Sequence, residues 1–305
     1  MTQDALRALE VTAGHSRRDV LAGASLTVPR ASITALLGRN GAGKTTFLDV
    51  ALGLLPRQGG ELAVQGIDPA RDGDGVRRCV AAVSSDEPMD EGERVRELIR
   101  LHASLRRGFR QDLADRLFAR FAVDGARRVR ELSRGQRQKV AILIALASGV
   151  DFLILDEPFD GLDIGVRDEI TGALVEHVDE TGAAVLVASH DIGEIERLAD
   201  RVAILNGGRI VAEGPVDRVC GRVRRWSAVA TESFDPTALP SGFSVEVRAK
   251  RVLVTFVGEG APDFDAVAAR GLGAVESLPE TGLRDAFLTL TQPTGAPTIE
   301  EVHRW

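Results

Sequence analysis

A glycine-rich stretch early in the chain has the residue types and the spacing that hold phosphate groups. Directly after the apolar run Ile33 to Leu37, the sequence fits the pattern G-x-x-x-x-G-K-S/T at every position. Glycines allow successive backbone N–H groups to point inward, and a helix expected over about 44–52 directs its positive end at the same point. We therefore predict a cradle for the phosphates of ATP or GTP, formed by Gly38, Asn40, Gly41, Ala42, Gly43, Lys44, Thr45 and Thr46.

Two side chains of this stretch have more specific tasks. We expect Lys44 to reach the β- and γ-phosphates, and the hydroxyl of Thr45 to ligate the Mg²⁺ that accompanies the nucleotide. The alternative is a glycine-rich turn that only caps a helix. Strand, loop and helix follow one another in the order that the phosphate-binding motif requires, which favours the cradle.

Two carboxylates come directly after a short apolar run further along the chain. The run 151–155 is typical of a central parallel strand covered on both faces, and such a strand ends at the edge of the sheet where ligands bind. Asp156 is placed to hold Mg²⁺, usually through water, and Glu157 to polarise the attacking water. A helix-capping pair is the alternative, but the phosphate loop upstream favours the catalytic interpretation.

Composition and charge limit the class of protein. With 305 residues and 44% apolar content, the chain can form one large domain and one small one. A net charge of -7 and a pI of about 5.4 do not favour nucleic acid or an anionic membrane surface, so we expect no nucleic-acid partner. Between Arg106 and Lys139, ten arginines and one lysine face four acidic residues. A solvated helical face explains this surplus better than a partner- or lipid-facing patch.

The sequence gives no sign of a disulfide framework, a zinc site, a signal peptide or a membrane span. Cys79 and Cys220 lie outside any C-x-x-C or Cys/His cluster, and residues 1–10 are mixed polar. The longest apolar run, Val140 to Ala147, is far shorter than the ~20 residues that cross a bilayer. We expect a soluble protein of a reducing compartment that conducts nothing through a membrane by itself.

Periodicity divides the chain into regions. Residues 4 to 83 are rich in expected strands, and three amphipathic helices are expected between about 86 and 150, over 93–105, 111–121 and 133–147. A helix over 166–178 and a buried strand over 185–189 follow. After Gly214-Pro215, we expect a hairpin of 244–247 with 252–257 and helices over 264–269 and 283–290. We predict an ATP-binding domain at 1–220, with its helical subdomain at about 86–150, and a small accessory domain at 221–305.

Four motifs in order resemble the ATP-binding-cassette (ABC) family. Leu132-Ser133-Arg134-Gly135-Gln136 is similar to the family signature Leu-Ser-Gly-Gly-Gln, with Arg134 in place of one glycine. The resemblance also covers the phosphate loop, Asp156-Glu157-Pro158 with Gly161-Leu162-Asp163, and Ser189-His190-Asp191. It implies an α/β P-loop nucleotide hydrolase with an antiparallel β subdomain and a helical subdomain, followed here by a small C-terminal α+β appendage.

The resemblance also implies how the site works. Two cassettes pack head to tail, so Ser133, Arg134, Gly135 and Gln136 of one copy complete the γ-phosphate shell of the other in trans. His190 contacts the γ-phosphate and holds the water beside Glu157, while Asp163 relays the state of one site to the other. The cofactors are ATP and Mg²⁺, and a homodimer hydrolyses ATP to ADP and phosphate.

Two positions depart from the family pattern. Family members commonly stack a tyrosine on adenine, and the corresponding residue here is His15, which offers less stacking area. The family also has a coupling-loop glutamine after the strand expected over 79–83, where this chain has Ser85 and Asp86. Asp86 is a candidate ligand of hydrated metal, or the metal contact is missing. We expect activity to survive, because Thr45 and Asp156 remain.

The resemblance implies the ATP-hydrolysing subunit of an ABC transporter. A separate integral-membrane permease docks on the helical insertion, roughly 86–130, which places the chain at the cytoplasmic face of the cell membrane as a peripheral protein. The region 200–214 and the ending 283–290 look like stand-alone cassettes of bacterial export systems, although import systems and sodium or copper extruders share parts of this pattern.

Two other functions fit the sequence less well. A soluble ABC ATPase acting on ribosomes or nucleic acid is disfavoured, because the chain has one cassette and no long insertion between Lys44 and Ser133. A nucleotide-gated module that does not hydrolyse is disfavoured by Glu157 and His190, which such a module does not need.

Overall fold

The computed structural model describes residues 4–15, 18–85, 89–231, 234, 242–248, 251–259, 262–268, 271–279 and 281–292. The chain divides into two compact units, Met1–Glu213 and Gly214–Trp305. The helix α8 (Val216–Cys220), which the sequence-based boundary at 220 assigns to the first domain, belongs to the second unit. The assignment of functions to residues 1–220 and 221–305 stays a prediction.

A six-stranded sheet forms the centre of the first unit, in the order β5-β6-β7-β3-β8-β9. Its strands are β5 (Ala81–Ser84), β6 (Phe152–Asp156), β7 (Ala184–Ser189), β3 (Ser32–Leu37), β8 (Arg201–Asn206) and β9 (Arg209–Pro215). The strands from β5 to β8 are paired in parallel. All residues of β3 and β7 are buried, since both faces of the sheet are covered.

A second sheet in this unit is antiparallel, in the order β2-β1-β4. It consists of β1 (Leu6–His15), β2 (Arg18–Val28) and β4 (Gly59–Val64). Leu21, Leu26 and Val64 from these strands share one core with Phe47 of helix α1 (Lys44–Ala51). The expected α/β fold with an antiparallel β subdomain is therefore confirmed.

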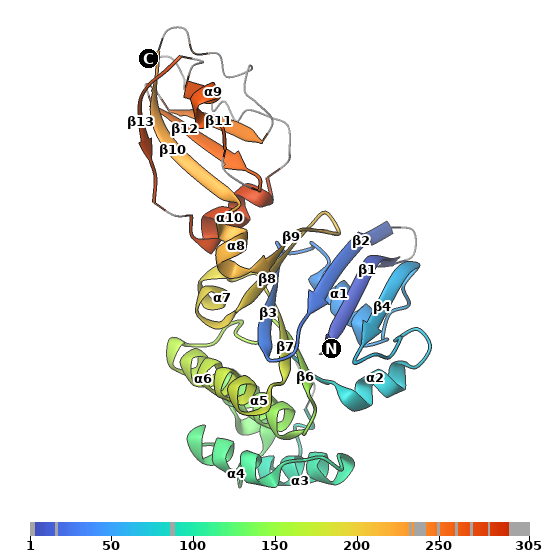
Figure 1. The fold of residues 1–305 in the computed structure, drawn as a ribbon. Helices are drawn as coiled ribbons and strands as arrows, with labels where there is room; N and C mark the ends of the chain where they lie inside the picture. The colour runs from blue at the N-terminus through green and yellow to red at the C-terminus, as the bar shows by residue number, and fades with distance from the viewer. Residues whose placement is uncertain are drawn as a thin grey trace. The chain divides into compact units, whose positions relative to one another are not determined.

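The helical region lies at one end of the first unit (Figure 1). It contains α3 (Val95–Leu105), α4 (Gln111–Arg120) and α5 (Arg134–Ala147), each within two residues of its predicted bounds. Helix α5 packs against α3, α4 and α6 (Ile164–Thr181), so it joins the region to the rest of the unit. A short α7 (Ile192–Leu198) follows β7. No helix in the described ranges is long and apolar enough to span a membrane.

The prediction of a strand over 79–83 is wrong at its start. Cys79 ends helix α2 (Gly73–Cys79), and strand β5 begins only at Ala81. The sequence hides this helix because glycines in its first turn lower its intrinsic helix propensity. The carboxylate of Asp72 compensates as N-cap, since it accepts the N–H of Gly75 at 2.7 Å.

The second unit has its own sheet and core. Its strands pair antiparallel in the order β11-β12-β10-β13, with bounds β10 (Val223–Ala230), β11 (Phe243–Arg248), β12 (Arg251–Val257) and β13 (Leu272–Ser277). The helices are α8, α9 (Phe264–Ala268) and α10 (Leu283–Leu290). Trp226, whose ring centroid is 4.6 Å from that of Phe264, packs on a small valine cluster. The predicted hairpin and both predicted helices are confirmed.

Candidate functional site

The phosphate loop connects β3 to α1 and adopts a backbone shape that needs glycine. Gly41 and Gly43 have positive φ angles of 79° and 107°, and Gly43 is the N-cap of α1. A Cβ on Gly43 would lie 3.1 Å from the side chains of both Val20 and Leu21. No side chain caps α1, so its first N–H groups remain available to an anion.

Lys44 folds back over this loop. Its side chain is only 7% exposed, and its ammonium donates to the carbonyl oxygen of Gly38 at 2.9 Å. The same ammonium lies 3.1 Å from Oε1 of Glu157, at the end of strand β6. A buried lysine needs such compensation, and the Glu157 carboxylate provides it.

Asp156 and Thr45 meet at the edge of the sheet. The Thr45 hydroxyl donates to Oδ2 of Asp156 at 2.8 Å, while Oδ1 is buried without a hydrogen-bond partner. Burial raises the pKa of Asp156, the hydrogen bond from Thr45 lowers it, and the negative charge of Glu157 raises it further. A hard divalent cation such as Mg²⁺ would satisfy the orphaned oxygen and offset the cost of burying the carboxylate. The donor set therefore fits this ion.

Glu157 is the residue where the contacts converge. Its backbone has a positive φ of 48°, and its N–H donates to the carbonyl oxygen of Ala188 at 2.9 Å. Its Oε2 accepts the backbone N–H of His190 at 3.2 Å and lies 2.9 Å from Nδ1 of that residue. An uncommon backbone conformation over-determined by its surroundings often marks a functional position. Glu157 thus links the phosphate-loop lysine to the histidine that follows β7.

The structure describes Ser85 of the predicted coupling loop and the backbone of His15, the predicted base-stacking residue. The N–H of Ser85 donates to the carbonyl oxygen of Asp156 at 3.1 Å, which puts Ser85 beside the predicted metal ligand. Asp86 lies outside the described residues. The backbone of His15 ends β1 opposite Arg18, and its side chain also lies outside what is described. The roles of Ser85, Asp86 and His15 stay predictions.

The signature turn begins helix α5. Ser133 is the N-cap, and its hydroxyl accepts the N–H of Gln136 at 3.2 Å while the Gln136 side chain accepts the N–H of Ser133 at 3.0 Å. A Cβ on Gly135 would lie 3.3 Å from the side chain of Val166, in the first turn of α6. Ser133 and Gln136 thus satisfy each other's backbone N–H groups at the start of α5.

Arg134 has a partner that the sequence analysis missed. Its guanidinium pairs with Asp160 at 3.0 Å and lies against Gly161, so it connects the signature turn to the loop that follows β6. The local sequence carries no signal for this pair, because basic residues surround Arg134 and Asp160 lies 26 residues further along the chain. Asp163, two residues further, caps α6 by accepting the N–H of Val166 at 2.9 Å.

The sequence of this chain is similar to those of known proteins. A family model described as ABC transporter matches residues 21–160. Daunorubicin resistance ATP-binding protein DrrA3 of Streptomyces coeruleorubidus is 32% identical over 289 residues, which is 91% of this chain and 89% of that protein. Lipopolysaccharide export system ATP-binding protein LptB of Escherichia coli K12 is 31% identical over 218 residues, covering 68% of this chain and 90% of LptB.

A solved structure described as the ATP-binding subunit of an ABC transporter is also similar to this chain. Its TM-score is 0.65 at 28% identity, and the match covers 70% of this chain and 91% of that one. The match with DrrA3 is longer than the first unit, so it continues into the second.

Proposed function

Since the chain belongs to the ABC transporter ATP-binding family, whose members hydrolyse ATP to ADP and phosphate in support of transport, we propose that it drives an exporter. In this proposal, ATP closes a homodimer of the chain, and the closing and opening move a separate membrane permease. The observation that carries the proposal is the Glu157 carboxylate, which contacts Lys44 on one side and His190 on the other.

ATP binding would change the partners of Lys44. The triphosphate would lie on the N–H groups of the phosphate loop at the start of α1, and the Lys44 ammonium would turn from Glu157 to the β- and γ-phosphates. Thr45 and Asp156 would hold Mg²⁺, which neutralises phosphate charge when bound. Glu157 would then be released from its ion pair with Lys44 while it keeps its contact with His190.

Hydrolysis would follow from this release. The freed carboxylate of Glu157 can accept a hydrogen bond from a water molecule and polarise it for attack on the γ-phosphate. His190 would hold the carboxylate through Nδ1, which leaves the far side of its ring for the γ-phosphate. The contacts of Glu157 with His190 place its carboxylate beside the residue that follows β7.

The second half of the site would come from another copy of the chain. Ser133 is the N-cap of α5, and Gly135 lies in the first turn of this helix. Head-to-tail pairing would bring this start to the γ-phosphate of the partner. Arg134 would add positive charge at that interface, and Asp163 would lie between the two sites.

Export and membrane docking rest on the relatives and on the helical region. DrrA3 is described as a resistance protein and LptB as part of an export system, which supports outward transport. Helices α3 and α4 line a cavity of about 340 Å³ that includes Arg96, Ile99, Arg100 and Phe118. A cytoplasmic loop of the permease would dock there, and the chain would lie at the cytoplasmic face of the membrane.

Phosphate release by the purified chain tests the proposal. The parent is expected to release phosphate in the presence of ATP and Mg²⁺, and Glu157→Gln is expected to lose about 100-fold or more of this rate. Glu196→Gln, the same change at an exposed position of α7, serves as control and is expected to match the parent. No release from the parent, with or without membranes, would favour the non-hydrolysing module instead.

A further inference from the structure

A cavity in the second unit is lined mainly by arginines. Its volume is about 420 Å³, and its walls are Arg218, Gly221, Arg222, Arg224, Gly258 and Glu259. Three guanidinium groups face one carboxylate there, which leaves a surplus of two positive charges. None of these residues takes part in the nucleotide site of the first unit.

The local backbone explains why the arginines gather. Arg218 lies in the last turn of α8, and Arg224 is the second residue of β10. Between them the chain turns at Gly221, and Arg222 follows this turn. The N–H of Gly258, just after β12, donates to the carbonyl oxygen of Arg222 at 3.0 Å. One short turn between a helix and a strand thus brings three arginines to one cavity.

Arg218 and Arg224 are exposed, whereas Arg222 is half-buried and its Nε atom is buried without a hydrogen-bond partner. In the part of the chain that the structure describes, no ion pair involves Arg218, Arg222 or Arg224. Arg225, the next residue, also has a buried Nε without a hydrogen-bond partner, but its guanidinium is paired with Asp285 of α10. A buried guanidinium donor without a partner is costly, so an anion in this cavity would be stabilised.

We propose that this cavity binds a phosphate monoester group, carried by a lipid headgroup or by a soluble phosphate compound. Guanidinium groups bind phosphate through paired N–H donors, and a monoester at neutral pH carries about -1.5 to -2 charges, which matches the surplus of two. The volume exceeds what a phosphate alone needs and lies in the range of small-ligand sites. Glu259 would favour a ligand with a hydroxyl or amine beside the phosphate.

The test uses the full chain carrying Lys44→Ala, so that the phosphate loop of the first unit does not capture the probe. Calorimetric titration with glycerol 3-phosphate tests the soluble source. Sedimentation with phosphatidylcholine vesicles containing phosphatidic acid tests the lipid source, and vesicles with phosphatidylglycerol supply negative charge without a monoester. Binding of glycerol 3-phosphate, or stronger binding to the phosphatidic acid vesicles than to the phosphatidylglycerol vesicles, supports the proposal and identifies the source. No binding of glycerol 3-phosphate together with no preference for phosphatidic acid overturns it.

Substitution then locates the site. Arg222→Gln is expected to weaken binding about tenfold or more, and Arg222→Lys less, because lysine keeps the charge but loses the fork of donors. Arg284→Gln removes an exposed charge of the same unit and is expected to bind like the parent. Arg224→Gln is a second variant, and an unchanged tryptophan emission spectrum shows that the unit is folded. Unchanged affinity in both folded cavity variants would overturn the assignment, whatever the ATPase rate of the chain.

Discussion

The negative charge of Asp156 reduces the stability of the folded chain, because the carboxylate is largely buried. Its pKa is raised, chiefly by burial, so its folded pKa lies above its unfolded value. Such a group favours folding below the unfolded pKa and loses this contribution as the pH rises through the folded pKa, so at neutral pH the ionised carboxylate is unfavourable. Thr45 supplies the hydrogen bond that reduces this cost.

We predict that Asp156→Asn raises the Tm of the nucleotide-free chain at neutral pH by a few degrees. The amide oxygen keeps the hydrogen bond from Thr45 and carries no charge that must be buried. The same variant is expected to lose the rise in Tm that ATP with Mg²⁺ gives the parent. Differential scanning calorimetry checks both effects, and a variant less stable than the parent without nucleotide would contradict this account of Asp156.

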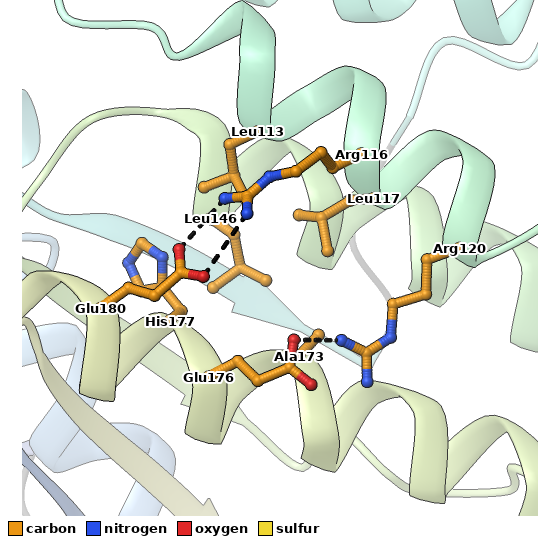
Figure 2. Close-up of a pocket in the computed structure, with 9 residues that line it drawn as sticks. All are labelled: Leu113, Arg116, Leu117, Arg120, Leu146, Ala173, Glu176, His177 and Glu180. Carbon is orange, nitrogen blue, oxygen red and sulfur yellow. Dashed lines mark hydrogen bonds and ion pairs between the residues drawn. The ribbon is translucent and has the colours of Figure 1, made fainter.

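His177 is a buried imidazole that the predicted nucleotide chemistry does not use. It is 6% exposed, and both ring nitrogens lack a hydrogen-bond partner. Figure 2 shows the ring beside a cavity of about 110 Å³ between α4, α5 and α6. The charged groups that face this cavity or act on the ring are Arg110, Arg116, Arg120, Glu176 and Glu180. Burial lowers the pKa of His177, Arg110 lowers it further, and Glu180 raises it.

We predict that His177 makes the chain less stable in mild acid. Because its folded pKa lies below the ordinary value of 6.5, the unfolded chain takes up a proton first, and stability falls as the pH drops below that value. His177→Gln removes this group and is expected to flatten the decline of Tm between about pH 7 and about pH 5.5. Parallel declines in parent and variant would show that other groups cause the acid sensitivity.

At the scale of elements, two ion pairs connect α4 to α6. Arg116 pairs with Glu180 at 3.1 Å and Arg120 with Glu176 at 2.6 Å, on either side of the His177 cavity (Figure 2). All four side chains are at least a third exposed. Solvent therefore screens these pairs, and the apolar contacts of α5 contribute more to the attachment of the helical region.

A double-mutant cycle on Arg120→Gln and Glu176→Gln is expected to give a coupling energy of about 0.2–1 kcal/mol in urea unfolding. A coupling above about 2 kcal/mol, the range of buried charged hydrogen bonds, would mean that the pair is desolvated in solution. Arg116→Gln with Glu180→Gln provides the matched cycle on the other side of the cavity.

The sequence predicted elements well where local signals agree. The helix over 283–290 has its predicted bounds, and the helix over 111–121 ends one residue earlier, because three- and four-residue apolar spacing marks both. Helix α2 was missed, since Gly73 and Gly75 lower its propensity and only the cap at Asp72 reveals it. Within the site, the motifs identified the residues, but the pairs Lys44–Glu157 and Arg134–Asp160 depend on strand order and loop packing, which local patterns do not encode.

At the scale of the whole molecule, the two units differ in which relatives have a matching region. The match with LptB covers 90% of that protein but only 68% of this chain, whereas the match with DrrA3 extends through 91% of this chain. The second unit is therefore an addition to the cassette, and the match with DrrA3 includes this addition. Its arginine cavity gives this addition a ligand site of its own in our proposal.

In the proposed dimer, two copies of the chain share each nucleotide. Ser133→Asp keeps a good N-cap for α5 but places a carboxylate where the γ-phosphate of the partner would lie. Lys44→Ala disables the phosphate loop and leaves the signature turn intact. Each variant alone is expected to be inactive, because every site in its homodimer lacks one half.

Mixing the two variants tests this claim most directly, with phosphate release as the measurement. Half of the dimers in an equal mixture contain both variants, and each of these has one intact composite site out of two, so about a quarter of the parent rate is expected to return. A mixture as inactive as its two components, or full activity of Ser133→Asp by itself, would contradict a site shared between two chains.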